Sequence, residues 1–434
     1  MRRLGVLLLL FAFLGGCVSI DRDTRHVRAA LQSNQREEAQ KYFGKMKEGS
    51  AEEGLSQALY EVEAARVGHL LGAEDEAAGL FRKAVDRAID RSENEPELRL
   101  TSLGANALAS TMMDDRVRAY GLAAYEVNFA LLYAILSQEA LGLREDALVD
   151  ARLAVYAQDQ LAETYGADLE KARAAVNEDA QKMTDYSMKD LETVMEATRN
   201  SWENPVLWWL TGVLFETNRE TEMAVKSYEK AAAVSPGNAF FQAEAATVRS
   251  RRALQANEAR LIVIAQDGLI SERKNRKLVL PIYTAISVDI PYYADAPYVP
   301  PTASLAVDGR TVPLTFALNV QSLAYRDLKE RMPGVMARNI ARALSVAAMQ
   351  AAAQASGDSA VKVSVALANL TLALMRSSDL RSWRTLPMGV YVTRVDPLPA
   401  GERRVRVTCG ERVLEKTLTL KPGETRVWLC DFVP

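Results

Sequence analysis

Residues 204–236 restrict the fold of this chain more than any other stretch, because their pattern predicts two short helices packed as a hairpin. Asn204 can cap the first helix, and Pro205 suits its first turn because the N–H that proline lacks has no partner there. Large and small residues recur on one face of each helix at the spacing i, i+4, i+7, so a small residue of one helix can receive a large residue of the other. The predicted packing positions are Trp208, Gly212 and Phe215 on the first helix, Ala224, Tyr228 and Ala231 on the second, and Pro236 after it.

This order of residues resembles the tetratricopeptide repeat, a two-helix unit of about 34 residues. The stretch matches nearly every diagnostic position of the repeat, with Thr211 standing where the family usually has leucine. Two further units, at residues 55–88 and 128–157, show a similar pattern around a glycine in the turn. Because such units bury their apolar faces only against their neighbours, the resemblance implies a helical repeat solenoid over residues 55–257.

The start of the chain has the features of a secretory signal. Two arginines precede an apolar run that is too short for a membrane-spanning helix. The sequence Leu-Gly-Gly before Cys17 resembles a bacterial lipobox, in which the cysteine is acylated and the preceding residues are removed; an ordinary signal peptide is the alternative. Val18 follows the cysteine, and the family's sorting rule then implies attachment to the outer membrane of a Gram-negative cell, facing the periplasm. We predict a signal at residues 1–16 and a lipidated tether with a first helix at residues 17–54.

Charge and residue counts exclude several classes of function. The formal net charge is −3 and no basic stripe is present, which argues against a nucleic-acid partner. The chain has two histidines, His26 and His69, and three cysteines. One cysteine is the predicted lipidation site and the other two lie on predicted strands, so we expect no structural zinc site. No phosphate-binding glycine loop and no serine-nucleophile elbow occur. We therefore predict no metal, no cofactor and no catalytic residues.

In the second half, the apolar periodicity changes from that of helices to that of strands. Residues 261–265 form an apolar run, and Asp308-Gly309 is a strong hairpin signal between two short strands. We predict an α+β region at residues 258–387. Residues 388–434 are expected to form a small antiparallel unit, and its opening resembles extracytoplasmic β-sandwich modules of the PEGA type.

Cys409 and Cys430 are the two cysteines that remain besides the predicted lipidation site. An exported protein with an even pair of cysteines favours a disulfide. In a meander, the predicted strands that carry them run in the same direction, which can bring both ends to one edge of a small sheet. If the sheet folds over as a sandwich, the two ends can instead face each other across the core. We therefore predict a disulfide between them, with two free core thiols as the alternative.

Two segments have the composition of binding surfaces. Residues 291–301 form a loop rich in proline and tyrosine, and tyrosine offers a large contact area at low entropic cost. Residues 379–387 combine arginine and tryptophan, which are enriched at binding hot spots. The alternatives are tyrosines that cover a sheet edge and a packed linker. The candidate interaction residues are Tyr292, Tyr293, Tyr298, Arg381, Trp383 and Arg384.

Several strings spread along the chain together resemble an uncharacterised family of bacterial outer-membrane lipoproteins. They include residues 147–152 (ALVDAR), 262–269 (IVIAQDGL) and 382–387 (SWRTLP). The resemblance implies a TPR-like front, a C-terminal α/β region and outer-membrane attachment. It brings no known activity.

We therefore expect a non-enzymatic lipoprotein that presents a concave repeat surface to an unknown periplasmic protein. A regulator of peptidoglycan synthesis is the specific alternative, by analogy with lipoprotein activators of penicillin-binding proteins that also carry helical repeats. A periplasmic hydrolase acting on envelope polymers is a second alternative, from a different class of function.

Overall fold

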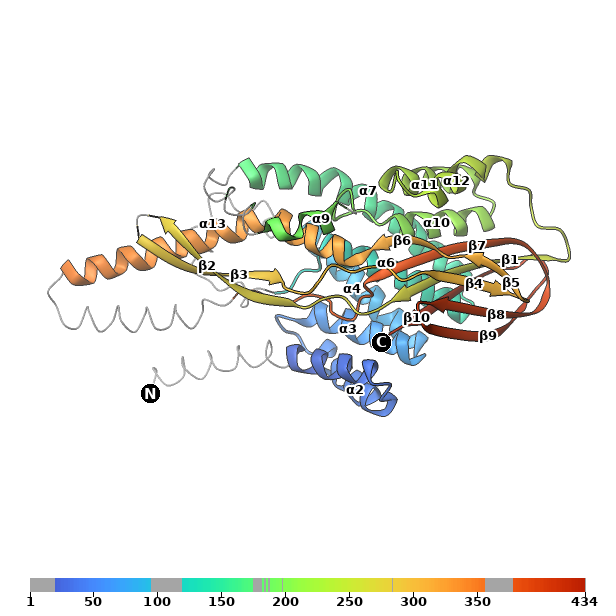
Figure 1. Cartoon of the computed structure of the whole chain (residues 1–434), viewed down its shortest axis with the longest axis horizontal. Helices are drawn as coiled ribbons and strands as arrows, with labels where there is room; N and C mark the ends of the chain where they lie inside the picture. Colours follow the sequence, from blue (N-terminus) through green and yellow to red (C-terminus); the bar gives the residue numbers. More distant parts are fainter. Residues whose placement is uncertain are drawn as a thin grey trace.

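The computed structural model describes residues 20–94, 119–174, 188–196, 198–282, 284–355 and 378–433, together with the single positions 182 and 185. The first part is helical, and a region of mixed and antiparallel sheets follows it (Figure 1). This confirms the predicted order of a mostly helical part and an α+β part. The predicted signal segment and Cys17 lie outside the described residues. No helix within the described ranges is long and apolar enough to cross a membrane.

The helical part begins with a helix that extends to residue 32, and the helices after it pack mostly against their neighbours in the sequence. The turns α3–α4 and α6–α7 contain Gly72 and Gly142, whose positive φ angles of 82° and 76° favour glycine. Three hairpins, α3–α4, α6–α7 and α10–α11, therefore follow one another along the helical layer. The bounds are α2 Arg36–Ala51, α3 Gln57–Leu71, α4 Glu74–Asn94, α6 Ala124–Leu141, α7 Arg144–Ala174, η3 Lys189–Leu191, α9 Glu192–Met195, α10 Pro205–Thr217, α11 Thr221–Val234, α12 Ala239–Thr247 and η4 Val248–Ser250.

The hairpin predicted at residues 204–236 is α10 and α11, and its predicted contacts are present. The Asn204 side chain accepts hydrogen bonds from the backbone N–H groups of α10 residues 206 and 207, at 3.0 and 3.2 Å. A Cβ atom at Gly212 would lie 2.8 Å from the ring of Tyr228, so glycine lets the two helices approach this closely. α11 ends shortly before Pro236. The remaining predicted packing residues are also buried, namely Trp208, Phe215, Ala224 and Ala231.

Within its described residues, the second part contains two four-stranded sheets and a separate two-stranded hairpin. One sheet has the order β10-β1-β7-β6, the other has the order β5-β4-β8-β9, and an apolar core lies between them. β1 pairs with β10 in parallel and with β7 in antiparallel orientation. The bounds are β1 Glu258–Asp267, β2 Arg273–Ile282, β3 Thr284–Tyr293, β4 Ala303–Val307, β5 Arg310–Pro313, β6 Thr315–Asn319, α13 Val320–Ala355, β7 Gly389–Pro399, β8 Gly401–Cys409, β9 Arg412–Leu420 and β10 Thr425–Phe432.

The structure does not contain the separate antiparallel tail predicted for residues 388–434. Two of its strands, β7 and β10, flank β1, and the other two, β8 and β9, join β4 and β5. The apolar run of β1 is buried along its length, so this strand takes a central place and needs a partner strand on each side. The pairing that results joins Arg260 to Thr425, far apart in the sequence. Strands from both predicted regions therefore form one sandwich.

The segment predicted as a tether is part of the folded body from residue 20 onward. Ile20 and Val27 are buried in the main core. Arg28 forms an ion pair with Glu272, with an N–O distance of 3.3 Å. Only residues 18 and 19 therefore separate Cys17 from the described fold.

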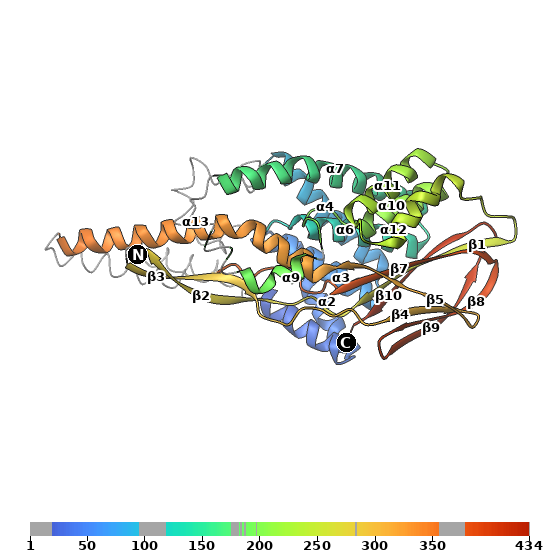
Figure 2. The same ribbon diagram turned by 45° about the horizontal axis from the view of Figure 1, so that its top comes forward.

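Two elements project from the body in the same direction in both views (Figures 1 and 2). One is the hairpin β2–β3, whose strands pair only with each other in the part of the chain that is described. The other is the C-terminal half of α13. They lie side by side, and Asn339 Nδ2 donates a hydrogen bond to Asp289 O at 3.1 Å. We call residues 273–293 together with residues 337–355 the arm.

Candidate functional site

The segment 378–388, which carries three of the predicted interaction residues, lies between the helices and the sheets. Trp383 has no exposed surface (0%), and its ring centroid lies 5.9 Å from that of Tyr133 on α6. Arg381 and Arg384 are only 8% and 5% exposed. These residues are not accessible to a partner, and their burial supports the alternative of a packed linker.

Two buried carboxylates hold the backbone of this segment. Glu126 of α6 accepts the N–H of Trp383 at 2.9 Å. Glu63 of α3 accepts hydrogen bonds from Arg384 N and Thr385 Oγ1, both at 2.6 Å. Burial raises the pKa of Glu63 to about 7, although these hydrogen bonds oppose the rise. The linker is thus held partly by a carboxyl group that titrates near neutral pH.

The tyrosines of the predicted loop also pack inward. Tyr293 is buried against Tyr325 of α13, with ring centroids 4.3 Å apart. Tyr298 donates its hydroxyl hydrogen to Asp267 Oδ2 at 2.7 Å. Tyr292 packs against the main core. These contacts support the alternative in which the tyrosines cover the sheet.

The first helix of each hairpin faces the chain's own sheet. Arg66 of α3 and Tyr133 of α6 both donate hydrogen bonds to Gln266 Oε1 of β1, at 2.9 and 2.8 Å. Glu216 of α10 forms an ion pair with Arg260 of β1 at 2.9 Å. The helix surface that we expected to be open to a partner therefore contacts β1 and its neighbours.

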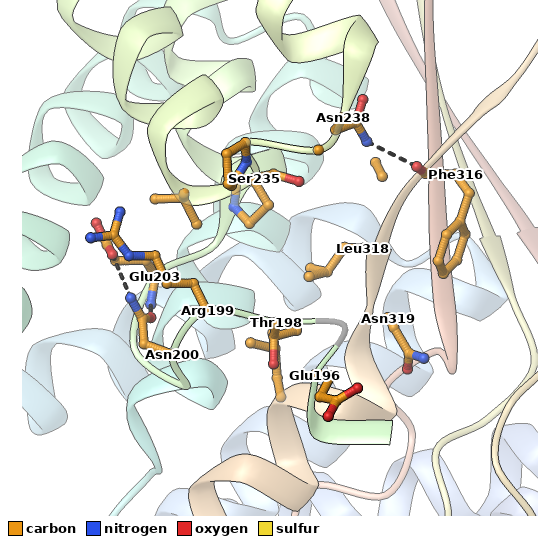
Figure 3. Close-up of a pocket in the computed structure, with 16 residues that line it drawn as sticks. Glu196, Thr198, Arg199, Asn200, Glu203, Ser235, Asn238, Phe316, Leu318 and Asn319 are labelled. Carbon is orange, nitrogen blue, oxygen red and sulfur yellow. Dashed lines mark hydrogen bonds between the residues drawn. The ribbon is translucent and has the colours of Figure 1, made fainter. Parts of the chain in front are cut away.

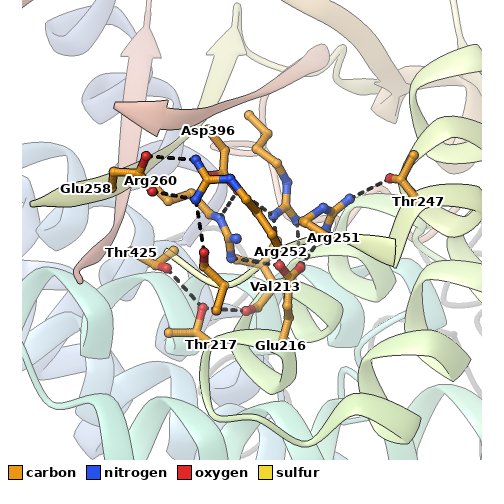
Figure 4. Close-up of polar contacts among 12 residues, drawn as sticks. Val213, Glu216, Thr217, Thr247, Arg251, Arg252, Glu258, Arg260, Asp396 and Thr425 are labelled. Carbon is orange, nitrogen blue, oxygen red and sulfur yellow. Dashed lines mark hydrogen bonds and ion pairs between the residues drawn. The ribbon is translucent and has the colours of Figure 1, made fainter. Parts of the chain in front are cut away.

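The contact between α10 and the sheet is a cluster of opposite charges (Figure 4). Arg260 pairs with Asp396 of β7 at 2.6 Å as well as with Glu216. Arg251 and Arg394 approach the same Glu216 carboxylate at 2.6 and 3.2 Å. Burial would raise the pKa of Glu216, but the three guanidinium groups lower it below its ordinary value. A carboxylate held ionised by three cations suits a structural junction rather than proton transfer.

A second cluster contains the residue types of a hydrolytic triad but not its geometry. His69 Nδ1 lies 2.7 Å from Glu74 Oε2 and 3.4 Å from Ser137 Oγ. A triad needs the carboxylate and the hydroxyl on different ring nitrogens. His69 Nε2 instead lies 3.7 Å from Asp431, which is already paired with Arg66. Ser137 is fully buried, so this cluster ties α3, α6 and β10 together.

Cys409 and Cys430 are free thiols, and the predicted disulfide is not formed. Both are buried in the core between the two sheets, but Cys409 ends β8 and Cys430 lies in β10 of the other sheet. The prediction allowed two arrangements: a meander in which β10 follows β8 and β9 in one sheet, or a sandwich in which the two ends face each other across the core. Because β10 pairs with β1 instead, and Cys430 lies opposite Ala265, the expected common sheet edge does not exist.

A pocket of about 490 Å³ lies where the loop before α10 and the end of α11 meet β6 and the start of α13 (Figure 3). Its volume is within the usual range for ligand pockets of roughly 300–1,000 Å³. Its lining combines apolar side chains, side-chain amides and charged groups, among them Pro236, Leu318, Leu323, Asn238, Asn319 and Arg199.

β6 forms one wall of this pocket and is the last strand of its sheet within the described residues. Asn238 Nδ2 donates a hydrogen bond to Phe316 O at 3.0 Å, so a backbone group of β6 already bonds a side chain on this side. A strand edge offers backbone donors and acceptors to an extended chain. The pocket therefore combines a strand edge, amide side chains and apolar contacts, as a peptide-binding groove does.

The sequence did not indicate this pocket, because its wall comes from three distant segments at residues 196–205, 234–238 and 316–323. The nearest signal is the turn after Pro236. Asn238 in that turn caps α12 by accepting a hydrogen bond from Phe240 N at 3.0 Å. That pattern predicts a helix start and says nothing of a binding site.

No group of three or more histidine, cysteine, aspartate or glutamate side chains suited to a metal ion occurs in the part of the chain that is described. No protein-family model, curated protein or solved structure matches this chain.

Proposed function

We propose that this protein is an outer-membrane lipoprotein, anchored through Cys17 and facing the periplasm, which binds a partner protein without catalysing a reaction. The observation that carries the binding proposal is the pocket beside the edge strand β6. An extended segment of the partner would pair with β6 by strand addition and place side chains into the pocket.

The helical hairpins have a different role in this proposal from the one expected of a repeat scaffold. We infer that they are tetratricopeptide-type repeats, which the close packing of Gly212 on Tyr228 supports. Their inner helices contact the chain's own sandwich through Gln266 and Glu216. The repeats therefore hold the sandwich in place, and the partner binds where the last repeat meets β6.

A single substitution should close the pocket and leave the fold intact. A Cβ atom built on Gly237, which lines the pocket, meets nothing within 4 Å. Gly237→Trp should therefore fold normally and fill the groove. Gly79 on α4 is equally open, so Gly79→Trp is the matched control.

The test is crosslinking in intact cells from a photoreactive residue placed at Ser235, followed by mass spectrometry. We expect a discrete adduct with one envelope protein, which Gly237→Trp abolishes and Gly79→Trp leaves unchanged. A penicillin-binding protein in that adduct would specify regulation of peptidoglycan synthesis. Adducts that Gly237→Trp does not affect would contradict binding in this pocket.

Membrane attachment is tested separately by cell fractionation. Cys17→Ser should move the protein out of the membrane fraction, because the acyl chains on that cysteine are the proposed anchor. Unchanged fractionation, with no mass added to residue 17 in the wild type, would contradict the lipid anchor.

A further inference from the structure

The free end of the arm lacks charged residues. In the hairpin, Arg273, Lys274, Arg276 and Lys277 all precede residue 278, and the segment 278–288 has none. Residues 343–355 of α13 are also uncharged. Because charged residues usually cover projecting surfaces in water, an uncharged projection indicates a surface that contacts something apolar.

At the free end Val279 is exposed, whereas Leu278 and Val288 pack with the main core. Val279 of β2 is 66% exposed, among the largest values for an apolar residue in the described chain. Ala351 and Ala352 near the end of α13 are exposed as well. Both elements of the arm thus present apolar groups to their surroundings.

The predicted lipid anchor lies close to the base of the arm. Asp21, near the start of the described chain, pairs with Arg384 at 2.5 Å, and Arg28 of the same helix pairs with Glu272 at 3.3 Å. Glu272 immediately precedes β2. Cys17 is three residues before Ile20, and three residues span at most about 11 Å. The acyl chains are therefore attached near the point from which the arm extends.

The arm is longer than the three residues that join Cys17 to Ile20. Strands of ten residues, such as β2 and β3, extend roughly 33 Å at 3.3 Å per residue. In Figure 1 the first described helix, in the deepest blue, begins on the side toward which the arm projects. A bilayer within reach of Cys17 on that side is also within reach of the end of the arm.

We infer that the arm is a second membrane contact, in which its uncharged free end, exposed at Val279 of β2 and at Ala351 and Ala352 of α13, enters the lipid layer that holds the acyl chains of Cys17. The inference rests on the lipid anchor of the proposed function. Lys274 and Lys277 of β2, which are exposed, would lie at the level of the head groups, where anionic lipids attract lysine and arginine. Charge and position thus favour a phospholipid surface over a second copy of this chain.

The test uses the acylated full-length mature protein in vesicles of phosphatidylethanolamine and phosphatidylglycerol. Val279→Cys is labelled with an environment-sensitive fluorophore such as NBD. The label is selective because Cys409 and Cys430 are buried and the thiol of Cys17 carries lipid. Val413→Cys on β9 of the sandwich, where the valine is 41% exposed, is the matched control.

We expect the label at position 279 to shift to shorter wavelength on vesicles and to lose most of its emission when doxyl-labelled phospholipids are included. The label at position 413 should show neither change. Vesicle flotation of the same samples tests the anchor: protein that does not float contradicts both the anchor and the arm contact. Protein that floats while the label at 279 stays in water overturns the arm contact alone. A shift at 279 without quenching by lipid, together with a doubled mass in light scattering, overturns it in favour of self-association.

Discussion

The close packing of Gly212 on Tyr228 predicts that a methyl group at position 212 destabilises the protein. In Gly212→Ala, the new methyl group would lie 2.8 Å from two ring carbons of Tyr228. The ring cannot easily move, because its hydroxyl donates to Glu216 Oε2 at 2.7 Å and accepts from Arg394 Nη2 at 2.6 Å. Tyr228 is also completely buried. The added methyl group should therefore push α10 and α11 apart.

Two opposing terms set the magnitude. Inserting a methyl group into a well-packed core usually costs about 1–3 kcal/mol. Replacing glycine by alanine within a helix stabilises the helix by about 1 kcal/mol, because alanine loses less backbone entropy on folding. Gly212→Ala should therefore lower the free energy of unfolding by up to about 2 kcal/mol, in the direction opposite to the usual effect of this substitution in a helix.

Gly79→Ala on α4 is the control, because its methyl group would meet nothing within 4 Å. This variant gains the same helix propensity without a contact like that of the methyl group with the Tyr228 ring, so it should stabilise the protein by about 1 kcal/mol. Urea unfolding of both variants, followed by circular dichroism, gives a difference of about 1–3 kcal/mol if the contact is as described. Equal stability of the two alanine variants would refute the close approach of these helices.

Three more predictions follow from buried groups. The pKa of Glu63 is raised to about 7 in the folded state, so the folded protein binds a proton that the unfolded chain releases between pH 4.5 and 7; stability should fall by roughly 3 kcal/mol as pH rises through that window. The urea midpoint of the wild type should be lower at pH 8 than at pH 5, and that of Glu63→Gln should not show this fall. An equal change of midpoint in the two proteins would contradict the prediction. Trp383→Ala should cost about 3–5 kcal/mol in the same assay because the ring is fully buried, whereas a loss under 1 kcal/mol would mean that the linker is loosely packed. Cys409 and Cys430 should react with a thiol reagent only after unfolding without reductant, and two unreactive cysteines in the unfolded protein would indicate a disulfide.

The sequence predicts those features of the fold that depend on neighbours along the chain. Gly212 and Tyr228 lie in one hairpin, so helical periodicity places them on facing surfaces. The strands of the tail were recognisable for the same reason. The pairing of Arg260 with Thr425 was not, because no local pattern says which distant strand completes the sheet. The disulfide prediction was wrong for the same reason, because the pairing of β10 with β1 could not be predicted.

The burial of the linker, residues 378–388, could not be predicted from the sequence either. Trp383 and Arg384 have the composition of a binding surface, and their burial depends on Glu63 and Glu126, which occupy helices far away in the sequence. A glutamate in a helix normally indicates a solvated face. Only the fold shows that these two carboxylates accept backbone hydrogen bonds from the packed segment 378–388.

The central claim is that β6 receives an extended segment of a partner protein. Hydrogen–deuterium exchange tests it most directly, on the protein alone and in complex with the partner segment that crosslinking from Ser235 identifies. We predict slower exchange in the amides of residues 315–319 on binding, with exchange along α7 unchanged and no effect of the segment on Gly237→Trp. Protection on the surface of α7 or elsewhere, with the exchange of β6 unaltered, would contradict the account.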